Sequence, residues 1–135
     1  AQMTLWAMAR SPLMFGGAAT MLDPFTTALL GNDEVLAINA QSGANRQVSA
    51  DTAVVVWTAK LATASRTYVA VFNVGASASS HTVAMQALGL GAAQRCDAHD
   101  VWRASGVPGA AMDGTVTAKV PATGVGLLRL SNCVP

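Results

Sequence analysis

Hydrophobic and polar positions follow one pattern in the first forty residues and another in the rest of the chain. Residues 2–10 combine good helix formers with apolar residues, which predicts the last turns of a buried helix. Ser11-Pro12 ends this helix, because the residue before a proline is disfavoured in the helical conformation. Leu13–Phe15 is then apolar on both faces, as a strand inside a parallel sheet would be. We therefore expect a buried strand there, followed by a glycine-containing loop over residues 16–20.

Two short helices are predicted after this loop. The first has Asp23 as its N-cap, Pro24 at its first helical position and Gly31 at its end. The second has Asn32 as its N-cap and two acidic residues in its first turn, where the helix dipole favours negative charge. The predicted apolar faces of the two helices are Phe25, Ala28 and Leu29, and Val35, Leu36 and Ile38.

The second half of the chain has the period of strands. A polar, glycine-containing segment over residues 41–50 marks the boundary, and short β-rich runs separated by turn residues follow it. The predicted strands are 52–59, 67–74, 81–86, 94–102, 114–120 and 124–131. The fold class is therefore mainly β, with residues 41–135 as an antiparallel β-sandwich. Residues 1–40 hold one isolated α/β unit, which indicates the end of something larger.

Composition excludes several classes of function. The 135 residues are 52% hydrophobic and 11% charged, with a formal net charge of +1, which fits a globular protein and gives no electrostatic footprint for nucleic acid. No apolar run approaches the roughly 18 residues of a membrane span. Residues 1–10 lack a signal-peptide pattern, as a mature or truncated chain also would. Two cysteines are compatible with a secreted or periplasmic protein but do not require one.

The segment Cys96-Asp97-Ala98-His99-Asp100 contains residue types that bind metals. On a strand, however, Cys96 and Asp100 face one way and Asp97 and His99 the other, so the ligands do not converge. We expect no metal and no cofactor. A Cys96–Cys133 disulfide is the better interpretation, since the strand holding Cys96 and the end of the last strand can be neighbours. Whether the two are bonded depends on geometry that the sequence does not give.

Two further sets of residues have structural explanations that outweigh functional ones. His81 and His99 lack a serine or cysteine nucleophile in a recognisable setting, so surface or hydrogen-bonding roles are favoured over catalysis. Trp57, Tyr68 and Trp102 have rings that could stack on sugars. Their apolar neighbours make packing in the core the default. No substrate-binding residue is assigned.

An ordered series of segments carries a resemblance to a known family. These segments are LWAMARSPLMFGG, then LDPFTTALLGNDEVLAIN, then VVVWTA, YVAVFNVG and DVW. Together they resemble the C-terminal third of a melibiase-type α-galactosidase, and the order W…SPL…G followed by N-x-E-V-x-A-x-N is the most specific part. The resemblance implies that residues 1–40 are the last strand and helices of a (β/α)8 barrel. It implies that residues 41–135 are the β-domain that follows the barrel.

The resemblance also implies an absence. Members of the family are retaining glycosidases with two catalytic aspartates, both on barrel strands upstream of the matching region. Retention needs two carboxyl groups roughly 5 Å apart, and no pair among the acids of this chain is convincing. These acids are Asp23, Asp33, Glu34, Asp51, Asp97, Asp100 and Asp113. We expect no catalytic residue here.

The chain departs from the family pattern at two places, and the first of them affects the rim of the barrel, where active sites of this fold lie. Ala18 stands where the family usually has an aspartate, and Asn39-Ala40-Gln41 stands where the family commonly reads Asn-Gln-Asp. Full activity is therefore in doubt even for a barrel completed by another chain.

Two functions are compatible with these observations. In the first, the chain is the non-catalytic C-terminal segment of an α-galactosidase-like hydrolase acting on terminal α-galactosides. Residues 1–40 then pack against a catalytic barrel supplied by a missing region or by another chain. In the second, the chain is a stand-alone β-sandwich that binds carbohydrate or protein and uses its N-terminal segment to dock or to form a homo-oligomer. Neither includes a nucleic acid or a membrane as partner.

Overall fold

The computed structural model describes residues 1–103, 109–111 and 113–135. Helices occupy the N-terminal part of these residues: α1 (Gln2–Met8), the 3-10 turn η1 (Ala19–Met21), α2 (Pro24–Leu30) and α3 (Asp33–Gln41). The strands are β1 (Gly43–Ala50), β2 (Val54–Leu61), β3 (Arg66–Asn73), β4 (Ser79–Ala84), β5 (Arg95–Asp100), β6 (Gly109–Ala111), β7 (Thr115–Val120) and β8 (Val125–Val134). The 3-10 turns η2 (Ala62–Ala64) and η3 (Met85–Leu88) follow β2 and β4. None of the described helices is both long and apolar enough to cross a bilayer.

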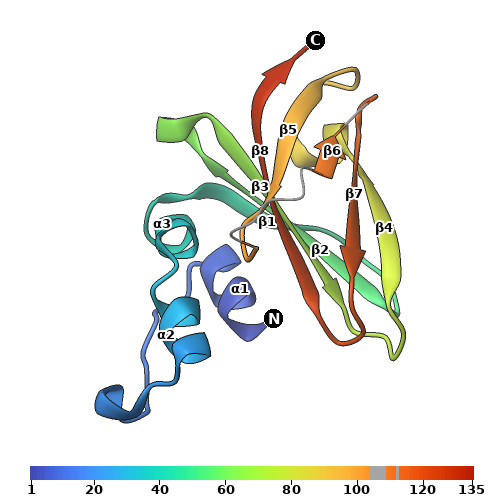
Figure 1. The fold of residues 1–135 in the computed structure, drawn as a ribbon. Coiled ribbons are helices and arrows are strands. Elements are labelled where there is room, and N and C mark those ends of the chain that lie inside the picture. The colour runs from blue at the N-terminus through green and yellow to red at the C-terminus, as the bar shows by residue number, and fades with distance from the viewer. Residues whose placement is uncertain (104–108, 112) are drawn as a thin grey trace.

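The strands form two antiparallel sheets of unequal size. Six strands pair in the order β1-β2-β3-β8-β5-β6, and β4 pairs with β7 on one side of this larger sheet (Figure 1). A hydrophobic core that includes Val56, Val69, Val116 and Leu130 fills the space between the two sheets. The helices lie on the other side of the large sheet (Figure 1). The large sheet is thus the middle layer of three, which agrees with the predicted antiparallel β-sandwich.

The helix-end predictions are confirmed. The Asp23 side chain caps α2 by accepting a hydrogen bond from the Thr26 N–H at 2.6 Å, and Gly31 follows the last helical residue. These backbone hydrogen bonds lower the pKa of the Asp23 carboxyl. The Asn32 side chain caps α3 by accepting from the Glu34 and Val35 N–H groups, both at 3.1 Å. Capping is a local interaction, so the sequence was sufficient to place it.

The predicted buried strand at Leu13–Phe15 is wrong for this chain. Residues 11–16 are in neither helix nor strand, and Met14 and Phe15 are 84% and 49% exposed. A strand needs a neighbour to accept and donate its backbone hydrogen bonds. All described strands of this chain pair within the two sheets instead. Within this run, Leu13 packs in part against the core under the helices, whereas Met14 and Phe15 stay exposed.

Two strands were missed. The segment over residues 41–50 was taken as a polar boundary, yet residues 43–50 form β1 along the edge of the large sheet. Its side chains are mostly exposed and its register with β2 shifts twice, so it lacks the alternation that identifies a strand. The other missed strand, β6, has only three residues.

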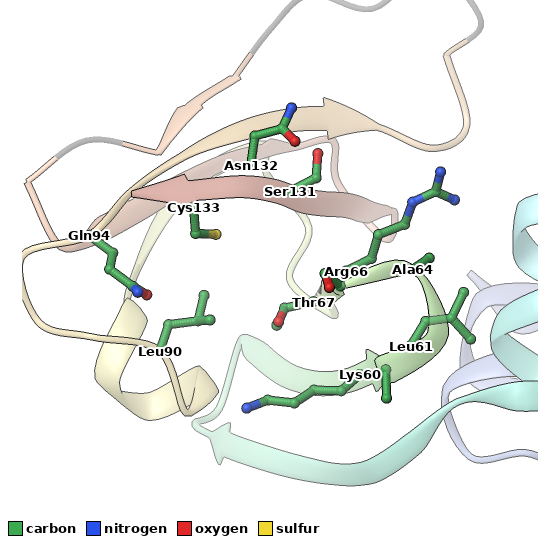
Figure 2. Close-up of a pocket in the computed structure, with 12 residues that line it drawn as sticks. Lys60, Leu61, Ala64, Arg66, Thr67, Leu90, Gln94, Ser131, Asn132 and Cys133 are labelled. Atoms are coloured by element: carbon green, nitrogen blue, oxygen red, sulfur yellow. The ribbon is translucent and has the colours of Figure 1, made fainter. Parts of the chain in front are cut away.

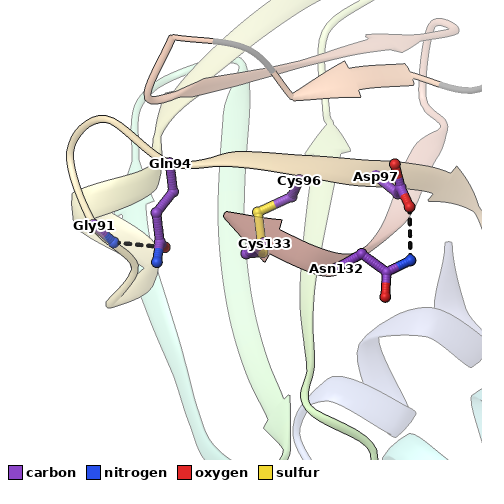
Figure 3. Close-up of a disulfide and its surroundings, with 6 residues drawn as sticks. All are labelled: Gly91, Gln94, Cys96, Asp97, Asn132 and Cys133. Atoms are coloured by element: carbon purple, nitrogen blue, oxygen red, sulfur yellow. Dashed lines mark hydrogen bonds between the residues drawn. A yellow bond between two sulfur atoms is a disulfide. The ribbon is translucent and has the colours of Figure 1, made fainter. Parts of the chain in front are cut away.

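A disulfide joins β5 to the end of β8. The Cys96 and Cys133 sulfur atoms are 2.04 Å apart, and the bond spans 37 residues of sequence (Figure 3). Beside it, the Asn132 amide donates to the Asp97 carboxylate at 2.7 Å (Figure 3). Cys96 is also a buried member of the core between the sheets. The cross-link therefore ties the last strand of the chain to its neighbour at the point where β8 continues beyond β3.

We predict that removing this bond lowers stability. Closing a loop of this length stabilises a protein by about 4 kcal/mol in the chain-entropy model. The double variant Cys96→Ala/Cys133→Ala should lose unfolding free energy of that order in urea denaturation, and a reducing agent should then have no further effect. A thiol assay on the denatured, unreduced wild-type protein is the direct check. Two free thiols per chain would contradict the bond.

Candidate docking site on the helical segment

The helical segment packs on the face of the large sheet that points away from the sandwich interior. A second hydrophobic core lies at this contact, separate from the one between the sheets. Helix α1 contributes Met3, Ala7 and Met8, helix α3 contributes Val35 and Ile38, and the sheet contributes Ala59, Leu61, Tyr68, Ala70, Phe72 and Leu127. Both apolar residues of α3 were on its predicted apolar face. Leu36, the third predicted member, is 37% exposed.

One carboxylate connects this segment to two strands. The Tyr68 hydroxyl of β3 donates to Glu34 Oε1 at 2.8 Å, and Arg129 Nη1 of β8 lies 3.0 Å and 3.1 Å from the two Glu34 oxygens. Arg66 adds a longer ion pair at 3.6 Å. Tyr68 and Arg129 are paired directly across the two strands, so both point at the first turn of α3. We call Glu34, Tyr68, Arg66 and Arg129 the Glu34 cluster.

Burial makes the Glu34 cluster chemically distinctive. The Tyr68 side chain is fully buried, and the Glu34 side chain is 19% exposed. Burial, followed by the hydrogen bond to Glu34 and the negative charge of Glu34, raises the pKa of the Tyr68 hydroxyl to about 12. The phenol therefore stays protonated as a donor to the carboxylate far above neutral pH.

Asparagine side chains make the remaining connections between the segments. Besides capping α3, Asn32 donates through its amide to the Val101 carbonyl at 3.2 Å. Asn39 donates to the carbonyls of Trp6 and Ser11, at 3.2 Å and 2.8 Å, which fixes the end of α1 against α3. Arg10 returns this contact by donating to the Asn39 and Ala40 carbonyls, at 3.1 Å and 3.0 Å.

These contacts give a physical meaning to the N-x-E-V-x-A-x-N series over residues 32–39. Its first residue caps α3 and binds the turn after β5, and its glutamate is the centre of the Glu34 cluster. Its valine is buried, and its last residue holds α1. Sequence reasoning explained Glu34 only through the helix dipole and missed its partners. The signal that could have identified it was the motif itself, because a helix dipole alone does not require glutamate at one fixed position.

The helical segment also carries most of the exposed large hydrophobic residues of the described chain. Of the nine large hydrophobic residues that are exposed among the described residues, seven lie within residues 1–40. They are Leu5, Trp6, Met14, Phe15, Met21, Phe25 and Leu36. Helix α2 buries none of its residues, and Phe25, on its predicted apolar face, is 75% exposed. We call these seven residues the apolar docking face.

Most of the acids considered as catalytic candidates have structural partners. Asp23 caps α2, and Asp51 accepts from the Ala53 and Val54 N–H groups at 2.7 Å, which lowers its pKa. Asp100 accepts from the Trp102 N–H and pairs with Arg103. Asp97 accepts from Asn132, and Asp113 pairs with Arg95 at 3.7 Å. Asp33 is exposed in the first turn of α3.

The other candidates are also placed. Asp97 and His99 alternate along β5 with Cys96 and Ala98, which face the sandwich core. Within the described part of the chain, no three His, Cys, Asp or Glu residues gather in a way that could hold a metal ion. Trp57 and Trp102 are half-buried against the core under the helices, and the Trp102 indole N–H donates to the Thr4 hydroxyl at 2.8 Å.

Comparison with known proteins decides the family. The profile described as the alpha-galactosidase C-terminal beta-sandwich domain matches residues 51–130. The chain belongs to this family. The match covers the strands β2 to β5, β7 and most of β8. The family assignment is therefore based on strands that form the core of the sandwich.

Known relatives extend the likeness beyond the sandwich. A β-L-arabinopyranosidase of family GH27 from Geobacillus stearothermophilus, crystallised with arabinose, superimposes with a TM-score of 0.87 and 32% identity over 98% of this chain. The α-galactosidase I of Mortierella vinacea has the same fold, with a TM-score of 0.83 and 24% identity over 95% of the chain. Alpha-galactosidase 2 of Arabidopsis thaliana is 29% identical over 104 residues, which are 76% of this chain.

The chain is much shorter than these proteins. It covers 30% of the Geobacillus protein, 34% of the Mortierella protein and 26% of the Arabidopsis protein. Because the superposition on the Geobacillus protein includes 98% of this chain, the helical segment is aligned together with the sandwich. The family profile and the superposition of both helices and strands therefore support the resemblance to the C-terminal portion of an α-galactosidase.

We predict that removing the charge of Glu34 destabilises the protein, whereas removing that of its neighbour does not. Glu34→Gln takes a charged acceptor from Tyr68 and Arg129, and hydrogen bonds to charged groups contribute about 1.5–3 kcal/mol. Asp33→Asn makes the same change of charge in the same helical turn at an exposed position. Urea unfolding should show a loss of about 2 kcal/mol for the first variant and less than about 0.5 kcal/mol for the second. Equal losses would contradict the role of the Glu34 cluster.

We predict an anomalous titration for Tyr68, which is the single tyrosine of the chain. Tyrosinate absorbance near 295 nm should rise with a midpoint near pH 12 in the folded protein, against about 10 in denaturant. Because the folded pKa is the higher one, the folded state holds the proton more tightly, and stability falls as the pH rises from about 10 to 12. Glu34→Gln should lower the folded midpoint. A folded midpoint near 10 would show that the hydroxyl is not held as described.

Proposed function

We propose that this chain is the non-catalytic C-terminal portion of an α-galactosidase-like glycoside hydrolase. In this proposal the sandwich holds the last part of a catalytic barrel, and the barrel itself comes from an upstream region or from another chain. The observation that carries the proposal is the apolar docking face. Folded monomers rarely leave so many large hydrophobic residues exposed, and such surfaces mark contacts with other protein.

The division of the chain at residues 40 and 41 is part of the proposal. Helices end at Gln41 and strands begin at Gly43, which supports a division close to this point. Residues 1–40 contact the sheet through one side and leave the other side free. In the proposed enzyme, Leu13–Phe15 would pair with the neighbouring barrel strand that the described chain lacks. Burying each of these residues would contribute roughly 1.5–3 kcal/mol.

Terminal α-galactosides are the proposed substrate class of the complete enzyme. The names of the relatives indicate a narrow group of sugars and do not single out one sugar. One relative is an α-galactosidase, and another is a β-L-arabinopyranosidase. Both of these relatives match the β-sandwich of this chain. We infer that the sandwich supports the barrel and that residues outside this chain select the sugar.

A chimaera tests this function. The part of the Arabidopsis α-galactosidase 2 that precedes its matching region is joined to this chain, and hydrolysis of an aryl α-galactoside is measured. We expect activity from the chimaera and none from this chain alone. Phe15→Asp and Phe25→Asp should each reduce the yield of active chimaera at least about tenfold, because each places a carboxylate in a contact that excludes water.

The control is Val74→Asp, which changes an exposed hydrophobic residue outside residues 1–40 and should leave the yield unchanged. In the isolated chain, where Phe15 and Phe25 are exposed, the same Asp variants should unfold at the wild-type temperature. Turnover by the isolated chain that depends on one of its own carboxylates would overturn the proposal. A fully active chimaera with Asp at both positions would show that the apolar docking face makes no contact that the barrel needs, and would overturn that part of the proposal.

A further inference from the structure

The large sheet has a notch beside the end of β8. Strand β3 pairs with β8 only as far as Thr67 and Leu130, but β8 continues to Val134 alongside β5. No described strand lies against the other edge of residues 131–134. An open cavity of about 500 Å³ occupies this position, between the turn η2, the end of β8 and the loop that follows η3 (Figure 2). Cavities of this size hold small organic ligands.

The charged side chains that line the notch are both cationic. Lys60 pairs across the hairpin with Thr67 and Leu61 pairs with Arg66, so the Lys60 and Arg66 side chains lie on opposite faces of the hairpin and point away from each other (Figure 2). Among the described residues, neither Asp nor Glu lines the notch. Lys60 donates one hydrogen bond to the Gly89 carbonyl at 2.9 Å, which uses one of its three N–H groups. Arg66 approaches a carboxylate only at 3.6 Å, and this carboxylate is already bound by Arg129.

The uncharged polar groups of the notch add donors. Gln94 accepts from the Gly91 N–H at 2.9 Å through its Oε1 atom, so its NH₂ group is left to donate (Figure 3). Ser65 and Ser131 contribute hydroxyl groups. None of the described lining residues has an aromatic ring, on which neutral sugars commonly stack. Positive charge with an excess of donors is the chemistry that recognises an oxyanion.

We propose that the notch binds a small oxyanion, the carboxylate or sulfate group of an acidic sugar or of a free anion, beside the Lys60 ammonium group. The ligand would lie against the Cys133 end of β8 and receive hydrogen bonds from Gln94 and a serine. This site is separate from the apolar docking face, and it does not depend on the function proposed above.

Calorimetric titration at low ionic strength tests the site with three probes: sodium galacturonate, sodium sulfate and galactose. We expect binding of at least one of the two anions and none of galactose. Lys60→Gln should weaken that binding at least about tenfold, and added chloride salt should weaken it in the wild type. The matched control is Lys119→Gln, since Lys119 is the other lysine of the sequence and is exposed on β7.

A second pair of variants guards against a folding defect in Lys60→Gln. Ala64→Glu places a carboxylate at an exposed position in the wall of the notch, and Thr63→Glu places one at an exposed position of the same turn outside the lining. Only the first should abolish binding, with equal unfolding temperatures for both. Galacturonate binding at least tenfold tighter than sulfate identifies an acidic sugar, and the reverse identifies a free anion. Galactose binding as tightly as galacturonate, or anion binding that survives Ala64→Glu, would overturn the site.

Discussion

The contact between Glu34 and the paired strands β3 and β8 decides how the helical segment sits on the sheet. An ion pair in water contributes little, because solvent screens it and ordering the side chains costs entropy. Here the carboxylate is largely buried and accepts from a fully buried phenol as well as from a guanidinium. Replacing the carboxylate would leave these donors unsatisfied at positions that water hardly reaches, and that penalty exceeds the net value of the pair itself. The main effect of the Glu34 cluster is therefore to fix one orientation of α3 on the sheet, and its net contribution to stability is the smaller effect.

This constraint makes the large sheet a layer with two dissimilar faces. Strand β3 is buried along almost its whole length on both sides, a pattern more typical of parallel than of antiparallel sheets. Val69 and Val71 face the sandwich core, whereas Tyr68, Ala70 and Phe72 face the helices. The sandwich core alone requires only one buried face. The second buried face exists because the helical segment covers it, so the sheet and the segment form one unit.

Local interactions account for what could be predicted from the sequence. The caps at Asp23 and Asn32, the proline and glycine at the ends of α2 and the alternating strands all depend on residues near one another in the chain. Strand β1 could not be predicted in this way, because an edge strand with mostly exposed side chains has no hydrophobic period. The Glu34 cluster was also out of reach, since its members are separated by 34 and 95 positions and only the tertiary fold brings them together.

The failed prediction at Leu13–Phe15 is the most informative of all. Its sequence has the character of a strand inside a parallel sheet, while its place in the structure is an exposed, unpaired segment. Natural sequences agree with their folds at most positions. The conflict at Leu13–Phe15 therefore arises only if the chain is assumed to fold without a partner. The same helical segment is held to the sheet by Glu34 and to the residue after β5 by Asn32, while Asn39 joins its helices. A segment that is held to the sandwich by specific hydrogen bonds and still exposes Met14, Phe15 and Phe25 fits the place that we propose for it, between the sandwich and a catalytic barrel.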